Sequence, residues 1–592
     1  MIPGFSPYNG PFRLQNLWSP DEKQEDMPSA LRLRGLKSAE IDFLLSYCHV
    51  SGADMGESVR SLGMGSSELV MQAASIRHGY PYLAPAAIDE IDPRDIAQYA
   101  PKLDENTSDI PHVPIALSED RSALLVAINN GFRYQDTVNR IRAYDKRLQV
   151  QFCLASKKTI QNIFRREFFD TRRLFDDARA GAGEDRYNKM LEALLLHACY
   201  QGASDIHLNP LPGRAGVCYL RIDGTLETFC FLTRSDREDE MGEPGEFDRI
   251  VQAIRADTNQ TDSDIIEGGL DKAIPEAVKG KFRFRVEITK AYFGNRAVVR
   301  ILNLADDAAE FHDIGFDPVT EKKLLRAVRQ SAGMLIVTGP TGSGKTTTIN
   351  ALMRTVDAME TSIQSVEKPV EIPEGLWVQH NARTHQDTSE AEEWLRWFKA
   401  LMRCDPDKMF FGEIRDAETT AVALDGANTG HTVLTTMHTR STAGAITRIR
   451  NLRRSMTGEG LDMDMVASNL LGILATRLVR KLCLHCRLPE DRREVLDAIN
   501  RVHPDLADHT SYKANPDGCP ACKGKGYKGR RLVYEYLDVT RKARIAISEG
   551  KSEIEIESLI PEAERLWGTA LRFVALGVTA YDEIQRVILE ER

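Results

Sequence analysis

A chain of 592 residues is long enough for about three or four domains. Its net charge of -10 argues against nucleic acid as the main partner, because phosphate binding needs clustered Lys and Arg that outweigh the acids. No apolar run approaches the roughly 20 residues that cross a bilayer, and the N-terminus lacks the basic and apolar regions of a signal peptide. We therefore expect a cytoplasmic protein.

The N-terminal part divides into a short lead-in and a mixed α/β domain. Residues 1–25 are rich in Pro, Gly, Asn and Ser, which predicts a flexible segment. Residues 26–173 are expected to form one domain, and nothing in them has the pattern of a reaction centre. The sequence of this domain predicts helices at 38–47 and 66–78, followed by strands at 113–117 and 123–128.

A linker and a second domain follow. The charged run 165–179 and the glycines after it predict a hinge with a linker at 174–186, because charge and glycine disfavour a packed interface. We place the second N-terminal domain at 187–310. It is expected to begin with a helix at 189–201 and strands at 203–208 and 217–222, after which Asp223-Gly224 is expected to form a hairpin turn.

The segment Phe282-Arg283-Phe284-Arg285-Val286 alternates apolar and basic residues. Such a strand buries its aromatic side chains on one face and directs two guanidinium groups from the other. This pattern fits an ordinary solvated face. It equally fits an arginine that faces a phosphate, since Arg matches γ-phosphate charge in other motors.

The third domain, expected at 316–592, contains a Walker A loop. An apolar strand at 334–337 enters a glycine-rich turn, and a helix leaves it, so that backbone N–H groups converge on a phosphate. Lys345 is expected to reach the β- and γ-phosphates of ATP, and the Thr346 hydroxyl to hold Mg²⁺. The candidate nucleotide-binding residues are Gly339, Pro340, Thr341, Gly342, Ser343, Gly344, Lys345, Thr346 and Thr347.

Acidic side chains follow two further strands of this domain. The strand 362–366 ends in Glu367-Lys368-Pro369-Val370-Glu371, and Pro369 disfavours helix at Lys368, so the segment should extend beyond the strand end. The strand 409–411 runs into Glu413, which is the Walker B arrangement. Carboxylates placed there can reach Mg²⁺ or the attacking water.

Histidines flank a fourth strand at 432–436. His431 precedes it and His438 follows it, which indicates sensing of the γ-phosphate or contact with a neighbour, because neutral imidazole both donates and accepts a hydrogen bond. Two structural histidines with satisfied hydrogen bonds are the competing interpretation.

Two C-x-x-C pairs follow, separated by 32 residues. Four thiolates are the tetrahedral set that structural Zn²⁺ prefers, so we expect a zinc-binding lobe at 480–530 with no open position for water. A redox pair or a chance spacing remains the alternative. The candidate ligands are Cys483, Cys486, Cys519 and Cys522.

Together these motifs resemble the secretion ATPases that drive type II secretion and type IV pilus assembly. The nucleotide-binding motifs and the tetracysteine set carry the resemblance, as do Ala203-Ser204-Asp205-Ile206-His207 and Gly294-Asn295-Arg296-Ala297-Val298-Val299-Arg300. The retraction motors of the same superfamily lack the tetracysteine insertion, so the chain is similar to the assembly side.

The resemblance implies a multidomain α/β protein with a RecA-like P-loop ATPase core and a PAS-like second N-terminal domain. It implies a homohexamer, peripheral at the cytoplasmic face of the inner membrane, that moves a platform protein and contacts a membrane adaptor. It also implies that the domain at 26–173 binds partners. Glu371 matches the residue that polarises water, Glu367 and Glu413 match the acids that hold Mg²⁺ and its water, and Arg285 matches an arginine that reaches the γ-phosphate.

The chain departs from the family pattern at two positions. Lys272 stands where the family has a second arginine, and Lys368 replaces an aspartate of the acidic box. A cyclic di-GMP site is not indicated, since Leu31-Arg32-Leu33-Arg34-Gly35 matches the repeats that bind it only in degenerate form. A conjugation-type DNA translocase and a nucleotide-gated scaffold without useful turnover are the alternative functions.

Overall fold

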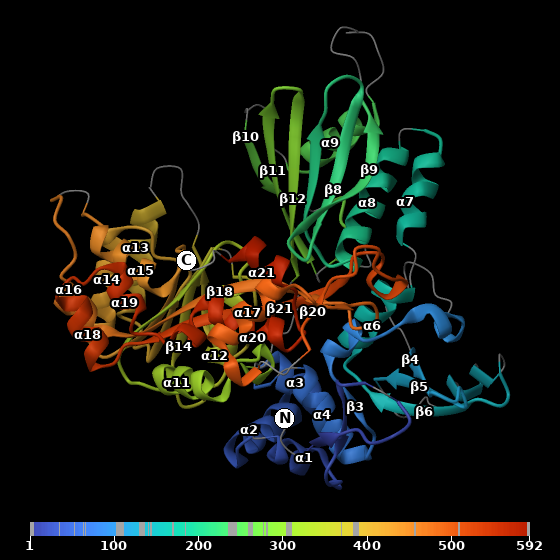
Figure 1. Cartoon of the computed structure of the whole chain (residues 1–592), viewed down its shortest axis with the longest axis horizontal. Coiled ribbons are helices and arrows are strands. Elements are labelled where there is room, and N and C mark those ends of the chain that lie inside the picture. The colour runs from blue at the N-terminus through green and yellow to red at the C-terminus, as the bar shows by residue number, and fades with distance from the viewer. Residues whose placement is uncertain are drawn as a thin grey trace. The chain divides into compact units, whose positions relative to one another are not determined.

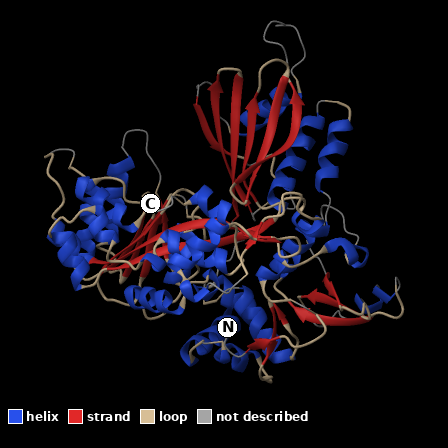
Figure 2. Cartoon of the chain, viewed as in Figure 1, coloured by secondary structure: helices blue, strands red, loops and turns tan. Residues whose placement is uncertain are grey.

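The structure, a computed structural model, describes the chain except residues 1–4, 13, 35, 53, 63, 66, 102–111, 130–136, 140, 143–144, 169–170, 184, 235–244, 259–264, 271, 276–277, 280–281, 304–310, 369, 383–389, 455–456, 507–509 and 589–592. It divides into two compact units. Unit 1 comprises Met1–Arg34 and Met71–Asp306, and unit 2 comprises Gly35–Val70 and Asp307–Arg592. Figures 1 and 2 show their helices and strands.

Unit 1 contains two six-stranded sheets. The first has the strand order β1-β2-β3-β6-β5-β4, in which β5 pairs parallel with β6 and antiparallel with β4. Its strands are β1 (Phe5–Pro7), β2 (Leu17–Pro20), β3 (Tyr82–Leu83), β4 (His112–Leu117), β5 (Ala123–Ile128) and β6 (Gln149–Leu154). The helices beside them in the chain are α1 (Met27–Leu33), α4 (Ser67–His78) and α6 (Lys157–Ile163).

The flexible lead-in expected over residues 1–25 is wrong for the described part of that segment. β1 and β2 form an antiparallel hairpin, and β2 pairs with β3. Phe5 and Leu17 are 4% and 1% exposed. The apolar side chains among the Pro, Gly and Ser residues therefore anchor the segment in the sheet, because their burial offsets the cost of ordering the chain.

The second sheet of unit 1 is antiparallel throughout, in the order β10-β11-β12-β7-β8-β9. Asp223 and Gly224 both have positive φ, which confirms the predicted hairpin turn. The strands are β7 (Ala203–Pro210), β8 (Ala215–Ile222), β9 (Thr225–Thr233), β10 (Ile265–Gly269), β11 (Phe282–Ala291) and β12 (Gly294–Asn303), with α8 (Asp185–Tyr200) and α9 (Glu246–Asp257) as the helices of this region.

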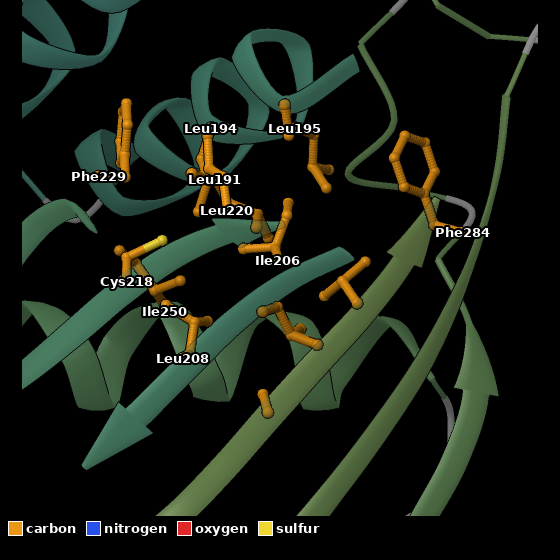
Figure 3. Packing of buried hydrophobic residues seen from close by; sticks show 14 of the residues in the cluster. Leu191, Leu194, Leu195, Ile206, Leu208, Cys218, Leu220, Phe229, Ile250 and Phe284 are labelled. Atoms are coloured by element: carbon orange, nitrogen blue, oxygen red, sulfur yellow. The ribbon is translucent and has the colours of Figure 1, made fainter. Parts of the chain in front are cut away.

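One face of this sheet is covered by helices and forms the core. Figure 3 shows Leu191, Leu194 and Leu195 of α8 above Ile206 of β7, and all four belong to one buried cluster. The alternate residues of the strands point to the opposite face. Most of the polar positions therefore lie on the face away from the core.

The prediction of a linker at 174–186 is also wrong for its N-terminal half, because that part of the chain is helical. α7 (Thr171–Ala180) packs against α8 and buries Phe175 completely. Arg179 forms an ion pair with Glu246 at 2.7 Å between Nη2 and Oε2. The charges of this segment lie on the solvent side of an amphipathic helix, so they do not prevent a packed interface.

Unit 2 is built on a seven-stranded sheet in the order β15-β14-β16-β17-β13-β18-β21, with parallel pairing except between β18 and β21. Its strands are β13 (Gly333–Thr338), β14 (Ile363–Glu367), β15 (Val378–Asn381), β16 (Lys408–Phe411), β17 (Thr432–Met437), β18 (Leu470–Leu482) and β21 (Tyr527–Asp538). A small sheet pairs β19 (Leu488–Pro489) with β20 (Tyr512–Lys513).

Helices pack on both faces of this sheet, and with its strands they form two clusters of buried apolar residues. All six residues of β13 are buried, as expected for a central parallel strand that is covered on both faces. The helices are α10 (Phe311–Ile314), α11 (Pro318–Val328), α12 (Lys345–Met353), α13 (Glu390–Leu401), α14 (Ala417–Asn428), α15 (Thr442–Asn451), α16 (Met463–Asn469), α17 (Arg493–Val502), α18 (Arg541–Ser548), α19 (Glu553–Glu557), α20 (Leu566–Ala575) and α21 (Tyr581–Val587).

Unit 2 also includes a piece of the N-terminal region, in which α2 (Ser38–Ser51) and α3 (Met55–Ser61) lie. Lys37, directly before α2, forms an ion pair with Asp357 and lies 3.7 Å from Glu360. This grouping differs from the expected single domain at 26–173. Among the helices within the described ranges, none combines the length and the apolar composition that a bilayer crossing requires.

Candidate functional site

The Walker A loop joins β13 to α12, and its backbone requires glycine at two points. Gly344 has a φ of 90° and ends the loop in the left-handed region. Gly339 has a φ of 154°, and a Cβ there would lie 2.5 Å from Ser343 Oγ and 2.6 Å from the Thr476 carbonyl oxygen. The loop therefore keeps its tight path only with these residues.

Lys345 is folded back across this loop. Its Nζ donates to the carbonyl oxygens of Gly339 and Pro340 at 2.9 and 3.0 Å. Burial lowers the pKa of Lys345 to about 8; the charges of Glu413 and Glu371 oppose this shift, and that of Arg477 adds to it. The lysine is thus half-buried, with two carboxylates and a guanidinium close enough to act on it.

The candidate nucleotide-binding residues belong to this turn and to the first residues of α12, and they differ in exposure. Ser343 is buried, and its Oγ lies 3.1 Å from Thr476 Oγ1 of β18. Residues with exposed side chains or backbone are Pro340, Thr341, Gly342 and Thr347, and those of intermediate exposure are Gly344, Lys345 and Thr346. Gly339 is buried like Ser343, so the loop rests on β18 through Ser343 and exposes mainly Pro340, Thr341 and Gly342.

Glu413 lies at the same edge of the sheet. β13, β16 and β17 are neighbouring parallel strands, so the residues after them meet where the Walker loop begins. The Ile414 N–H donates to the Thr436 carbonyl at 3.0 Å, which fixes the segment after β16 against β17. Arg415 Nη2 lies 2.8 Å from Glu413 Oε2. The predicted Walker B carboxylate is thereby held near Lys345.

His438 follows β17 and joins this cluster. Its Nε2 lies 3.5 Å from Glu413 Oε1, and Arg448 donates to its carbonyl oxygen at 3.1 Å. Burial and the charge of Lys345 lower the pKa of His438, while Glu413 raises it, so the ring is neutral at pH 7. A neutral imidazole here can accept or donate a hydrogen bond.

The acidic segment after β14 has one buried and one exposed carboxylate. Glu367 ends β14 and is 3% exposed; its Oε1 accepts from Ser365 Oγ at 2.7 Å and from Gln379 Nε2 at 3.2 Å. Burial raises the pKa of Glu367, and the charge of Glu371 raises it further. Glu371 is exposed, and Lys368 is exposed as well. Pro369, which we expected to shape this segment, lies outside the described residues.

His431 lies at the opposite end of β17 from His438. It precedes β17, so it sits at the amino edge of the parallel sheet, and six strand residues, about 20 Å, separate it from the other edge. Its Nδ1 lies 3.1 Å from the Gly426 carbonyl oxygen, and its own carbonyl accepts from the Gly333 N–H at 3.1 Å. Its predicted role, in sensing the γ-phosphate or in contact with a neighbour, stays a prediction.

The candidate arginine belongs to the other unit. Arg285 is exposed on β11 of unit 1, on the face opposite the core. The Lys272 N–H donates to both carboxylate oxygens of Asp257, at 2.9 and 3.0 Å. Both residues belong to unit 1, so their roles at the nucleotide remain predictions from the resemblance.

Two residues of β18 were missed by the sequence reasoning. Thr476 bonds to Ser343, and Arg477 is 7% exposed while its Nη2 donates to the Arg440 carbonyl oxygen at 2.6 Å. Burial lowers the pKa of Arg477, and the charge of Glu535 opposes that shift. A buried arginine inside the apolar run Leu470–Leu482 was the available signal, since buried charges are rare without a role.

The four candidate metal ligands form one cluster. Their Sγ atoms all lie within 4.8 Å of one another. Cys483 is 3.7 Å from Cys519, and Cys522 is 3.8 Å from both Cys486 and Cys519, so none of the four is in a disulfide. Gly526 N–H donates to Cys522 Sγ at 3.1 Å, as expected for a sulfur that carries negative charge. This arrangement can hold a metal ion.

Comparison with known proteins gives a family match over residues 181–586, to the model described as Type II/IV secretion system protein. The chain is 33% identical over 410 residues to the type II secretion system protein HxcR of Pseudomonas aeruginosa, covering 67% of this chain and 76% of that protein. It is 30% identical over 418 residues to the type IV pilus assembly ATPase TfpB of Acinetobacter baylyi, covering 70% and 68%.

The type IV pilus assembly ATPase PilB of Thermus thermophilus is 28% identical over 566 residues, which cover 90% of this chain but only 59% of that protein. Among solved structures, the pilus retraction motor PilT with bound ADP has a TM-score of 0.44 at 23% identity, covering 67% of this chain and 96% of that one. The DotB ATPase of Yersinia pseudotuberculosis has a TM-score of 0.47 at 19% identity, covering 69% and 94%.

Proposed function

Because this chain belongs to the type II/IV secretion system protein family, we propose that it is a Mg²⁺-dependent ATPase that powers assembly of a type IV pilus or of a type II secretion pseudopilus. Its relatives include proteins named as pilus assembly ATPases and as type II secretion proteins. The observation that carries the proposal is that the Walker loop after β13, Glu413 after β16 and His438 after β17 meet at the carboxyl edge of one parallel sheet, where Glu413 lies 3.5 Å from His438 and its charge acts on Lys345.

The proposed reaction is in-line attack of water on the γ-phosphate. The Walker loop N–H groups and Lys345 bind the phosphates, and Lys345 moves from the Gly339 and Pro340 carbonyls to the phosphate oxygens. Glu371, which is exposed, positions the water and accepts its proton. We propose that Arg285 meets the developing charge on the γ-phosphate.

The hydroxyl of Thr346 and the carboxylate of Glu413 suit magnesium, which prefers hard oxygen ligands. Bound magnesium would neutralise charge on the β- and γ-phosphates. Glu367 is proposed to act from its buried position as a support for Glu371 or for a metal-bound water. His438 is proposed to sense the γ-phosphate through its contact with Glu413.

We propose zinc as the metal of the cysteine cluster. Tetrahedral coordination with Zn–S bonds of about 2.3 Å requires sulfur separations of about 3.8 Å. The observed separations of 3.7 and 3.8 Å fit that geometry. With four thiolates zinc has no open position, so its role would be structural, joining the two C-x-x-C turns.

The family also suggests an assembly. We propose a homohexamer that is peripheral at the inner membrane and transmits movement to a platform protein through a membrane adaptor. The N-terminal region is the proposed partner-binding part. These partners remain proposals, since the chain spans only part of the Thermus relative.

The test compares steady-state phosphate release by the wild-type chain and by Glu371→Gln. The variant should bind ATP with near-normal affinity and release phosphate at least about a hundredfold more slowly, since it removes the proton acceptor. Near-normal turnover would contradict the role of Glu371 and favour Glu413 as the base. No turnover by the wild-type chain, alone or with its membrane partners, would contradict the ATPase itself.

A further inference from the structure

A cavity of about 240 Å³ opens on the face of the second sheet of unit 1 that points away from its core. Its walls come from β7, β8, β11 and β12. The alternation along the strands explains its polarity: Ile206 and Val299 point into the core, whereas Asp205, His207 and Arg300 line the cavity. The segments 203–207 and 294–300, which carry part of the family resemblance, thus meet here.

A row of charges crosses the sheet at this point. Arg300 is the cross-strand partner of Asp205, and Asp205 is the partner of Arg221. Arg300 Nε donates to Asp205 Oδ1 at 3.0 Å, and Arg221 Nε lies 3.8 Å from Asp205 Oδ2. One carboxylate is therefore shared by two guanidinium groups.

Arg296 adds a third guanidinium group. Its Nε donates to Asn209 Oδ1 at 3.0 Å, and its Nη2 lies 3.3 Å from His207 Nδ1. Both of these partners are neutral. Three arginines line the cavity against two carboxylates, Asp205 and Glu287, so positive charge is in excess.

The contact with Arg296 also fixes the tautomer of His207. A guanidinium group can only donate, so Nδ1 accepts and a neutral ring carries its proton on Nε2. Burial and the charge of Arg221 lower the pKa of His207, which keeps the ring neutral at pH 7. His207 is 9% exposed, and Nε2 is buried without a hydrogen-bond partner in the described structure. A buried N–H of this kind is rare and calls for an acceptor.

We propose that this cavity binds a small phosphate ester, with Arg296 and the Nε2–H of His207 contacting the phosphate oxygens. A forked guanidinium group and a neutral N–H donor suit a phosphate, which accepts several hydrogen bonds at once. Glu287 and Thr289, which also line the cavity, offer a carboxylate and a hydroxyl to the organic part of the ligand. Asp205 fixes the side chains of Arg300 and Arg221 through its ion pairs with both. None of these residues is among those proposed to act on ATP: Arg285 is the cross-strand partner of Arg300 but does not line the cavity.

Isothermal titration of the full chain tests this proposal, with inorganic phosphate and ribose 5-phosphate as probes. All measurements use the Lys345→Ala background, which weakens phosphate binding at the Walker loop. We expect one site per chain, with ribose 5-phosphate bound more tightly than inorganic phosphate. Arg296→Gln should weaken binding of both probes at least about tenfold, because it removes charge-assisted hydrogen bonds.

Arg283→Gln is the matched control. It removes the same charge from an exposed position of β11 outside the cavity and should leave binding unchanged. Absence of binding, or equal loss in Arg283→Gln, would overturn the proposal.

Arg296→Lys covers the case in which Arg296→Gln does not fold, as judged by circular dichroism. It keeps the charge but loses the fork, so intermediate affinity is expected, and unchanged affinity would contradict the contact. If Arg296→Gln left phosphate binding intact but altered the sedimentation of the chain, the cavity would be a contact between copies, and the ligand proposal would be wrong.

Discussion

The candidate nucleotide site and the tetracysteine cluster both adjoin β18, yet they are built in opposite ways. The nucleotide site combines a backbone turn with side chains from several strand ends, and Lys345 and Glu413 remain partly accessible. The cluster draws on two short turns, and its four sulfurs lie close to one another. An open site can admit a substrate, whereas a closed set of four ligands can only hold its ion.

β18 connects the two sites. Thr476, in the middle of the strand, contacts Ser343 of the Walker loop, and the strand ends at Leu482, directly before Cys483. The Cys483 N–H donates to the Gly526 carbonyl at 2.9 Å, so the cluster also ties β18 to the start of β21. Although β18 contacts both sites, we expect that each can be disrupted without loss of the other.

The largest effect is expected for Lys345→Ala. Loss of the ammonium group should lower phosphate release at least about a hundredfold, since it removes a donor aimed at the transferred phosphate. The zinc content per chain, measured by elemental analysis, should be unchanged. Loss of zinc in this variant would contradict the view that the two sites can be disrupted separately.

Removal of a cysteine ligand should instead lower the zinc content of the chain. Cys519→Ser is expected to reduce zinc below one ion per chain and to destabilise the lobe at 480–530 by more than about 3 kcal/mol, because loss of a structural metal ranks among the severe changes. Limited proteolysis would detect cleavage within the lobe. Cys404→Ser, which makes the same substitution at an exposed cysteine outside the cluster, is the matched control and should keep its zinc. Full zinc content in Cys519→Ser would contradict the four-thiolate site.

The two sites should also respond oppositely to pH. The pKa of Lys345 is lowered to about 8 by burial, so the free chain loses its ammonium as the pH rises through that value. Affinity for ATP should therefore fall above pH 8, by up to about tenfold per pH unit, until the pKa of the complex is reached. Metal should instead be lost as the pH falls, because protons compete for the thiolates. Fluorescent nucleotide titration and zinc release measure the two trends.

The smallest effect is expected for Thr476→Val, which keeps the shape of the side chain. It removes the hydrogen bond to Ser343, worth about 1 kcal/mol, so nucleotide affinity should fall about fivefold while zinc content stays constant. Thr569→Val, on α20, is the matched control and should leave affinity unchanged. An unchanged affinity in Thr476→Val would show that β18 does not support the loop.

Local sequence determined the features that depend on neighbouring residues. The Walker turn needs Gly339 because a Cβ there would clash, and Gly344 because its φ is positive; the strands around the turn follow from short apolar runs. The two C-x-x-C pairs likewise identify the four candidate metal ligands. The family, too, was readable from these motifs and is confirmed by the match over residues 181–586.

Only the tertiary structure decided which side chains meet. His431 and His438 flank the same strand, and the parallel pairing of β17 with β13 decides that His438 lies at the edge of the Walker loop. Leu17 joins a sheet through Leu83 of β3, which is distant in the chain, and Thr476 reaches the Walker loop because β18 pairs with β13. The cavity at His207 likewise depends on pairing between β7 and β12. Such contacts come from strand order and register, which long-range packing fixes and local patterns do not encode.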